Sequence, residues 1–320
     1  MKALYKTAYG KGFLELRDAP KPRPSEGEIL IRVHCCGVCG SDLHIEDDLH
    51  TYTPPVVLGH EFSGTVEEIG PGVTMHAVGD KVGFLKGWMP YPGVSGDGGF
   101  EQYMLAPQDC MWKIPEGISL DEASQFETLG TPMVSMKKIL NMQSGEPVVV
   151  TGVGMIGLCG IGIASVLGAR VYALGTERDL EYRLPLAKKM GAYKTMVFGE
   201  EALKEIRELR VSKWMEASGA AAAVEAAVNT VEPFGIVTSP GMGKGPWNIN
   251  VVRMTFNNIT LRGQWGGSTV EHMMEYTKWM QEGRLDIKPL LSTMPLTQWR
   301  QAFDMLRVQQ GVKILLDPSC

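Results

Sequence analysis

The stretch PVVVTGVGMIG, residues 147–157, predicts a buried strand that passes directly into a helix. Its run of three valines is typical of a strand that is covered on both faces. The spacing G-x-G-x-x-G follows at once, and its glycines permit a tight turn, close approach of the backbone to a pyrophosphate, and packing of the helix on the sheet. We therefore predict a dinucleotide-binding turn, whose cofactor-binding residues are Gly152, Gly154, Met155, Ile156 and Gly157.

Strands and helices alternate on the C-terminal side of this turn. A helix is expected to continue to about residue 168, and an alanine-rich helix is expected over 220–231. The predicted strands that follow the first one are 170–174, 193–198, 213–218, 234–239 and 258–263. Successive strand-helix units imply a doubly wound parallel sheet, so the fold class is α/β with a Rossmann domain over residues 129–264.

The N-terminal part of the chain has a different character. Residues 1–128 contain short strand patterns separated by Pro and Gly, among them 28–34, 62–70 and 80–84. We expect a β-rich domain there. Residues 265–320, with a helix near 269–281 and a strand near 312–316, are expected to return to that first domain. A chain of 320 residues with 44% apolar and 21% charged residues is long enough for two such cores.

Charge and hydropathy exclude other classes of protein. The net charge of −5 and the absence of Lys or Arg runs argue against nucleic acid or an anionic membrane as partner and favour a small-molecule substrate. Residues 147–169 are uncharged and long enough to span a bilayer, but they contain six glycines, and a buried strand and helix explain them equally well. The N-terminus lacks a signal peptide and the six cysteines do not resemble a disulfide framework, so we expect a cytoplasmic protein with reduced thiols.

The segment GVCGSDLH, residues 37–44, and the segment GHE, residues 59–61, combine the side chains of a catalytic zinc centre. Cys39 and His60 are predicted ligands, because zinc takes Cys sulfur, His nitrogen and carboxylate oxygen and keeps one position open. The third ligand is Glu61 or the more distant Glu127. Two simpler interpretations remain open: a buried apolar thiol at Cys39, and an N-terminal helix acid at Glu127.

Cys39 also forms a C-x-x-C pair with Cys36, which invites a redox or structural-zinc interpretation. The sequence has no second such pair and no thioredoxin-like strand-helix-strand context around this one, so the catalytic interpretation is preferred. Ser41, two residues after Cys39, is predicted to contact the substrate oxygen, and His44 is predicted to carry the proton onward through the cofactor ribose. Asp42 is expected to orient a ligand rather than bind the metal.

These motifs, in this order and spacing, resemble the zinc-dependent medium-chain dehydrogenase/reductase family, which contains alcohol and polyol dehydrogenases. The motifs that carry the resemblance are Cys39 to His44, Gly59 to Gly64, Gly79 to Val82 and the glycine turn at 152. The resemblance implies that residues 1–128 form a GroES-like catalytic domain, that the matching Ser41 and His44 act in proton transfer, and that Glu61 takes part as ligand or exchangeable neighbour. It also implies that Lys313 lies near the cofactor pyrophosphate and that the protein is a homodimer or homotetramer assembled through the cofactor domain.

The sequence departs from many members of this family in residues 85–99. Those members carry a four-cysteine structural zinc lobe at this point, whereas this loop contains no cysteine. We therefore expect one catalytic zinc and no structural zinc. Trp88, Met89 and Tyr91 in the same loop are candidates for lining a substrate cleft, with ordinary loop packing as the alternative.

The end of the second predicted Rossmann strand bears on the choice of cofactor. NAD enzymes usually place an acid there for the ribose 2′-hydroxyl, whereas NADP needs space and a cation for the 2′-phosphate. Gly175 occupies this tip, and Thr176 and Arg178 are predicted to bind the phosphate, as in NADP-using members of the family. Glu177, an acid close to this tip, instead favours NAD. The sequence thus favours NADP(H) over NAD(H).

The combined hypothesis is a zinc-dependent oxidoreductase that transfers hydride between NADP(H) and a secondary alcohol, polyol or sugar and the corresponding ketone or aldehyde. Such an enzyme needs a Lewis acid to polarise the substrate oxygen and a cofactor to exchange hydride. The alternatives are a zinc-free NADPH-dependent quinone or enone reductase, and a protein that binds the cofactor without turnover. Bound zinc would distinguish the zinc-dependent oxidoreductase from the first alternative, and measured turnover would distinguish it from the second.

Overall fold

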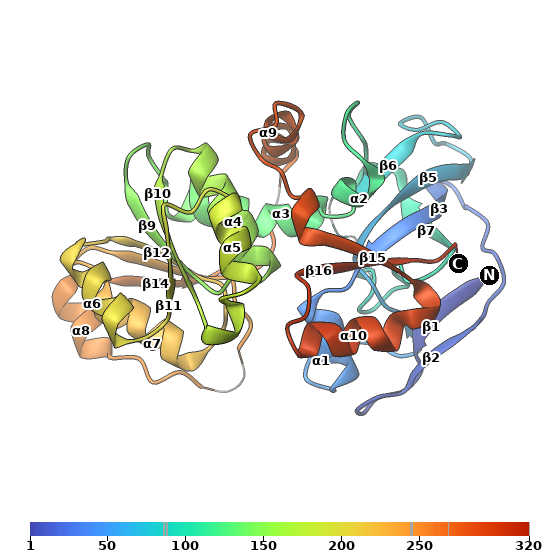
Figure 1. Cartoon of the computed structure of the whole chain (residues 1–320). Helices are drawn as coiled ribbons and strands as arrows, with labels where there is room; N and C mark the ends of the chain where they lie inside the picture. The colour runs from blue at the N-terminus through green and yellow to red at the C-terminus, as the bar shows by residue number, and fades with distance from the viewer. Residues whose placement is uncertain (86, 88, 244–245, 268, 320) are drawn as a thin grey trace. The chain divides into compact units, whose positions relative to one another are not determined.

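A computed structural model describes the chain except for residues 86, 88, 244–245, 268 and 320 (Figure 1). The chain forms two compact units. The first unit comprises Met1–Glu127 and Leu290–Cys320, and the second comprises Thr128–Pro289. Among the described residues, no helix combines the length and apolar character that crossing a bilayer requires.

The first unit is built around two β-sheets. The larger is a seven-stranded sheet with the order β15-β16-β3-β5-β6-β8, in which β7 also pairs with β3, and the smaller has the order β2-β1-β4. The strands are β1 (Lys2–Lys6), β2 (Leu14–Asp18), β3 (Glu28–Gly37), β4 (Val56–Val57), β5 (Glu61–Ile69), β6 (Lys81–Phe84), β7 (Tyr103–Pro107), β8 (Met111–Lys113), β15 (Leu291–Pro295) and β16 (Lys313–Asp317). The helices are α1 (Gly40–Glu46), α2 (Leu120–Ala123), the start of α3 (Phe126–Met133) and α10 (Trp299–Arg307).

One apolar core joins both sheets of the first unit. Phe62 and Phe84 stack with ring centroids 4.9 Å apart, and Trp299 of α10 meets Phe303 edge to face at 5.5 Å. Residues of β1, β3, β5 and β16 contribute to the same buried cluster. This core fixes the ends of β3 and β5, which carry the predicted metal ligands.

The second unit is a six-stranded parallel sheet with the order β11-β10-β9-β12-β13-β14. Its strands are β9 (Pro147–Thr151), β10 (Arg170–Gly175), β11 (Lys194–Val197), β12 (Lys213–Glu216), β13 (Ile236–Ser239) and β14 (Thr260–Gly263). Its helices are α4 (Met155–Val166), α5 (Arg183–Lys189), α6 (Glu200–Glu208), α7 (Ala221–Thr230), α8 (Val251–Asn257) and α9 (Val270–Gln281). The strand order is that of a Rossmann fold, which places the switch in winding direction between β9 and β12. The predicted α/β class with a doubly wound sheet is confirmed.

The point at which the chain returns to the first unit differs from the prediction. The sequence placed this return at residue 265, whereas the structure places it at 290. The intervening segment packs on the second unit: Glu275 of α9 pairs with Lys137 at 2.5 Å, and Arg284 donates to the carbonyl of Val166 at 3.1 Å. Periodicity located the helix correctly but does not reveal which core a helix packs against.

Candidate active site

Cys39 lies at the start of helix α1, where its neighbours fix its position. Strand β3 ends at Gly37 and the helix begins at Gly40, so Cys39 is the residue that caps the helix. Its backbone amide donates to Oδ2 of Asp42 at 2.8 Å. Asp42 is fully buried, and this burial raises the pKa of its carboxyl. The orienting role of Asp42 stays a prediction, and its described hydrogen bond is with the backbone of a metal-ligand candidate.

His60 and Glu61 occupy the junction between β4 and β5. Gly59 precedes them with φ of +92°, and a Cβ there would lie 2.6 Å from the sulfur of Cys36, so only glycine fits this turn. Both side chains that follow are buried. Burial alone would lower the pKa of the His60 imidazole, but the side chain of Cys39 and nearby carboxylates raise it to about 10. The surroundings therefore stabilise a positive charge on the His60 imidazole.

The donor atoms of Cys39, His60 and Glu61 lie within 4.8 Å of one another. A sulfur, a nitrogen and a carboxylate oxygen at such distances suit zinc. Among the described residues, Nδ1 of His60 and Oδ1 of Asp42 are buried without a hydrogen-bond partner, which is unusual for polar atoms in an interior. The residues present therefore fit the ion that the sequence predicts, with the three side chains as its candidate ligands.

Lys313 joins this cluster from the last strand, β16. Its ammonium donates to Oε2 of Glu61 at 2.5 Å and to the carbonyl of Val38 at 3.0 Å, and the side chain is 4% exposed. Gly37 makes room for the pair, since a Cβ there would collide with the Glu61 carboxylate and lie 3.1 Å from Cδ of Lys313. The predicted contact of Lys313 with a cofactor pyrophosphate stays a prediction, but its described contacts are with the carboxylate of a metal-ligand candidate. No local sequence pattern predicts this pairing.

Glu127, the other candidate for the third ligand, lies close to this group without belonging to the cluster of mutually close donors. It accepts a hydrogen bond from Tyr91, whose ring centroid is 6.3 Å from that of His60. Burial and the surrounding negative charges raise the pKa of Tyr91. Tyr91 therefore lies at the metal centre, whereas Met89 of the same loop is 83% exposed and Trp88 lies outside the described residues.

The predicted proton-transfer residues share helix α1. Ser41 is buried, and its hydroxyl lies 3.4 Å from Nε2 of His60. His44 follows three residues later and is partly exposed. Residues three apart are neighbours on one helix face, so the two side chains lead from the metal cluster toward solvent.

In the second unit, the predicted glycine turn joins β9 to α4 as expected. Gly152 has φ of +90°, and a Cβ there would lie 2.7 Å from the amide nitrogen of Ser218, while a Cβ on Gly157 would overlap the carbonyl of Gly152. Gly154 caps α4, and no protein atom lies within 4 Å of the position of its missing Cβ. The amides of Met155 and Ile156 in the first helical turn lack intrahelical partners and can bind an anion.

A buried carboxylate that the sequence did not single out supports this turn. Glu216 ends strand β12, next to β9 in the sheet, and its carboxylate accepts from the backbone amides of Ser218 and Gly219 at 2.8 and 2.9 Å. These bonds hold the segment that packs on Gly152. The only sequence feature that points to Glu216 is an acidic residue near the C-terminal end of the predicted strand 213–218.

The end of β10 has the features predicted to discriminate between cofactors. A Cβ on Gly175 would lie 3.0 to 3.1 Å from Val153, Asp179 and Leu184, so a larger side chain is disfavoured there. The hydroxyl of Thr176 donates to Asp179 at 2.7 Å, and that carboxylate is buried. Arg178 is exposed, and within the described part of the chain its side chain has no ion pair.

Replacing Gly154 with alanine is expected to weaken cofactor binding while leaving the stability of the fold nearly unchanged. Because φ is −77° and the space is open, alanine fits the backbone, and the free energy of unfolding should change by less than about 1 kcal/mol. The added methyl group occupies the space through which a pyrophosphate approaches, so the Kd for NADPH should rise about tenfold or more.

Thermal unfolding and fluorescence titration with NADPH measure the two effects. Gly199→Ala is the matched control, because this glycine is also extended and has no atom within 4 Å of its missing Cβ. An unchanged Kd in Gly154→Ala would show that the cofactor does not approach this turn.

A β-rich domain with a cluster of candidate metal ligands, together with a Rossmann domain, defines a two-domain dehydrogenase. Residues 25–116 match the family model described as alcohol dehydrogenase GroES-like domain, and residues 155–282 match the model described as zinc-binding dehydrogenase. The chain belongs to the zinc-dependent medium-chain dehydrogenase/reductase family and is an oxidoreductase.

Relatives match the chain over nearly its whole length. It is 31% identical to L-threonine 3-dehydrogenase of Pyrococcus horikoshii, over 98% of each chain. Among solved structures, 2R,3R-butanediol dehydrogenase from Bacillus subtilis has a TM-score of 0.88 at 24% identity over 99% of both chains. Galactitol-1-phosphate dehydrogenase from Escherichia coli has a TM-score of 0.86 at 23% identity, over 99% of this chain and 100% of that one. The two structural resemblances establish the fold only.

Proposed function

We propose that the protein is a zinc-dependent dehydrogenase that transfers hydride between NADP(H) and a secondary alcohol, polyol or sugar. The observation that carries the proposal is the cluster of Cys39, His60 and Glu61 donor atoms within 4.8 Å, beside a buried serine hydroxyl. When bound, zinc supplies Lewis acidity and the nicotinamide cofactor supplies hydride chemistry. The protein's own residues position the substrate and move the proton.

Ser41 and His44 form the proposed proton path. The Ser41 hydroxyl lies 3.4 Å from Nε2 of His60, beside the metal cluster, and a hydroxyl both accepts and donates hydrogen bonds, so it can take a proton from a substrate hydroxyl as it passes its own to a neighbour. His44 is partly exposed on the same helix face, so its imidazole can exchange a proton with solvent. Glu127, which accepts a hydrogen bond from Tyr91, is proposed as an alternative carboxylate for the metal.

The substrate class is proposed from the relatives. One matched relative is named for dehydrogenation of L-threonine at position 3, which carries a secondary alcohol. Metal content per chain and NADPH or NADH turnover, measured on one sample against secondary alcohols including L-threonine, polyols and their ketones, test the proposal. A metal-free protein that reduces quinones or enones would instead indicate the zinc-free reductase.

Arg178→Ala is expected to remove the preference for NADPH. The exposed guanidinium beside the glycine tip of β10 is the proposed partner of the 2′-phosphate. Its loss should lower kcat/KM for NADPH about 10- to 100-fold, as for a lost charge-assisted hydrogen bond, and change the value for NADH about twofold at most. Arg170→Ala, at the opposite end of β10, is the control. A wild-type preference for NADH, or an unchanged ratio in Arg178→Ala, would contradict the assignment.

A homodimer or homotetramer through the cofactor domain remains the proposed assembly. Strand β14 is at the edge of the six-stranded sheet, where its backbone can pair with another chain. On the neighbouring helix α8, Val251, Val252 and Phe256 are 65%, 65% and 83% exposed. An apolar group beside an open sheet edge supports an interface between copies.

A further inference from the structure

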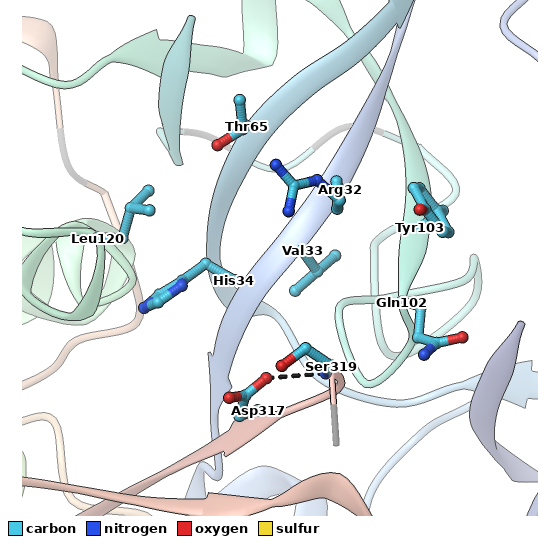
Figure 2. A pocket seen from close by; sticks show the side chains of 9 residues that line it. All are labelled: Arg32, Val33, His34, Thr65, Gln102, Tyr103, Leu120, Asp317 and Ser319. Carbon is cyan, nitrogen blue, oxygen red and sulfur yellow. Dashed lines mark hydrogen bonds between the residues drawn. The ribbon is translucent and has the colours of Figure 1, made fainter. Parts of the chain in front are cut away.

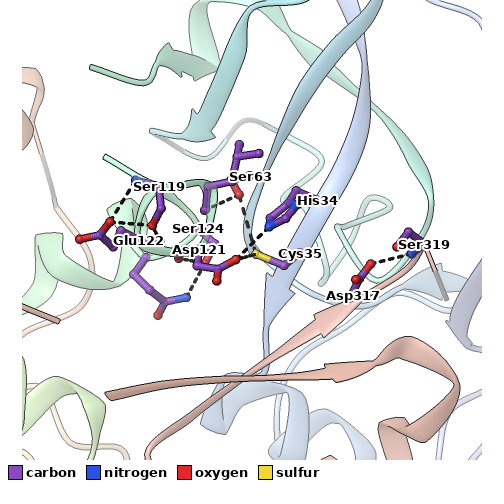
Figure 3. A network of polar contacts seen from close by, with 11 residues as sticks. His34, Cys35, Ser63, Ser119, Asp121, Glu122, Ser124, Asp317 and Ser319 are labelled. Carbon is purple, nitrogen blue, oxygen red and sulfur yellow. Dashed lines mark hydrogen bonds and ion pairs between the residues drawn. The ribbon is translucent and has the colours of Figure 1, made fainter. Parts of the chain in front are cut away.

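A second group of metal-binding side chains lies in the first unit, and it shares no residue with the Cys39 cluster. The donor atoms of His34, Cys35 and Asp121 lie within 4.8 Å of one another. His34 and Cys35 are consecutive residues of β3, and Asp121 lies in the first turn of α2. Figure 3 shows the three side chains close together beside the first turn of α2.

A β-bulge explains how two consecutive strand residues reach the same carboxylate. In a regular strand, successive side chains point to opposite faces. Here β3 pairs with β5 so that Val33 lies opposite Gly64 and Cys35 opposite Ser63, which leaves His34 as an extra residue. A bulge of this kind re-aims a side chain and is common beside functional sites.

The distances suit a transition metal with small adjustments. His34 Nε2 lies 2.9 Å from Asp121 Oδ1, and Cys35 Sγ lies 3.7 Å from the same oxygen. Tetrahedral zinc with ordinary bond lengths separates a nitrogen and an oxygen ligand by about 3.3 Å, and a sulfur and an oxygen ligand by about 3.5 Å. Side-chain movements of a few tenths of an ångström therefore bring these two pairs to the required separations, and the sulfur and imidazole nitrogen lie within 4.8 Å of each other.

The group is closed on one side and open on the other. Cys35 is fully buried, whereas the side chains of His34 and Asp121 are 47% and 42% exposed. Beside His34 lies a cavity of about 430 Å³, which Arg32, Thr65 and Leu120 also line (Figure 2). A metal ion can reach the group from solvent, and water can complete its coordination.

The competing explanation is a surface hydrogen bond between His34 and Asp121 beside a buried thiol that only packs. Burial raises the pKa of the Cys35 thiol to about 12, and the negative charge of Asp121 acts in the same direction. A bound metal would displace the thiol proton and the proton between His34 and Asp121. The two explanations therefore differ in a measurable way, because only a metal site produces a metal-thiolate bond.

We propose that His34, Cys35 and Asp121 form a second metal site, which takes zinc and joins helix α2 to strand β3. One sulfur, one imidazole nitrogen and one carboxylate oxygen are the donors that zinc accepts. The helix leads into Gln125 and Glu127, so a metal here stabilises the segment that carries a metal-ligand candidate of the active site. The proposal concerns a place other than the cysteine-free loop at 85–99, and it adds a second metal to the single zinc expected from the sequence.

Titration of the full-length Cys39→Ala variant with Co²⁺ tests the proposal, because this background lacks the cysteine of the active-site cluster. We expect one tightly bound equivalent with the near-ultraviolet absorption of a cobalt-thiolate bond. Adding Cys35→Ala should abolish that band, and adding His34→Ala should weaken binding at least tenfold. His34 is exposed, so its replacement leaves the fold intact.

His50→Ala in the same background is the control, because this exposed imidazole hydrogen-bonds with the adjacent Thr51 carbonyl, lies in neither cluster, and should not affect the band. Zn²⁺ should also raise the melting temperature of Cys39→Ala but not that of Cys39→Ala/His34→Ala. A missing thiolate band, or a band that survives Cys35→Ala, would overturn the proposal. Neither result affects the proposed dehydrogenase activity, which is measured in the wild-type protein.

Discussion

Cys39→Ala is expected to lower kcat/KM for the alcohol substrate by about 10³-fold or more and to remove one equivalent of zinc per chain. The thiolate is the only sulfur donor among the three side chains that meet within 4.8 Å. Polarisation of a substrate oxygen by a metal contributes several kcal/mol, and each 1.36 kcal/mol corresponds to about a factor of ten in rate. Metal analysis and steady-state kinetics on the same preparation measure both effects.

The fold and the cofactor site should survive this substitution. Cys39 is partly exposed at the start of a helix and does not belong to the buried apolar cluster described for the first unit. The Kd for NADPH should therefore stay within about twofold of the wild-type value, since the glycine turn lies in the second unit. Cys110→Ala, a buried thiol of the first unit outside both clusters, is the matched control. Full activity in Cys39→Ala would exclude this cysteine as a ligand.

Lys313→Met is expected to destabilise the first unit by about 3–5 kcal/mol, the range found when one partner of a buried ion pair is removed. The Lys313 ammonium and the Glu61 carboxylate are 2.5 Å apart, and both side chains are at least 96% buried. Methionine conserves the apolar stem but leaves the carboxylate without its cation. Urea denaturation of the metal-free protein measures the change, because a bound metal ion would itself supply a cation to Glu61.

Burial, rather than the distance between charges, is the cause of this large effect. Lys113 and Asp80 form a pair at 2.6 Å in the same unit, but the Lys113 side chain is 65% exposed. Lys113→Met should therefore cost less than about 1 kcal/mol. The double variant Lys313→Met/Glu61→Gln should recover part of the loss, because the neutral amide no longer needs a cation. Equal effects of Lys313→Met and Lys113→Met would contradict the argument.

Local chemistry explains why so much of the fold was predictable. The valine run before Gly152 and the glycine spacing after it specify a strand, a turn and a helix by backbone constraints alone, and the structure has these elements at Pro147–Thr151 and Met155–Val166. The same reasoning fails for residues 265–289. Their helix was located correctly, but its apolar side chains are compatible with either core, so only the folded chain decides where it packs.

The sequence by itself determined the family, the α/β class and the ligand candidates Cys39, His60 and Glu61, because these depend on residue types at short, fixed spacings. Tertiary structure alone decided that Lys313, more than 250 residues away in the chain, pairs with Glu61 and that Tyr91 bonds to Glu127. It also brought Asp121 to the bulge at His34 and Cys35. Such contacts arise from strand pairing and burial between distant segments, which no local pattern encodes.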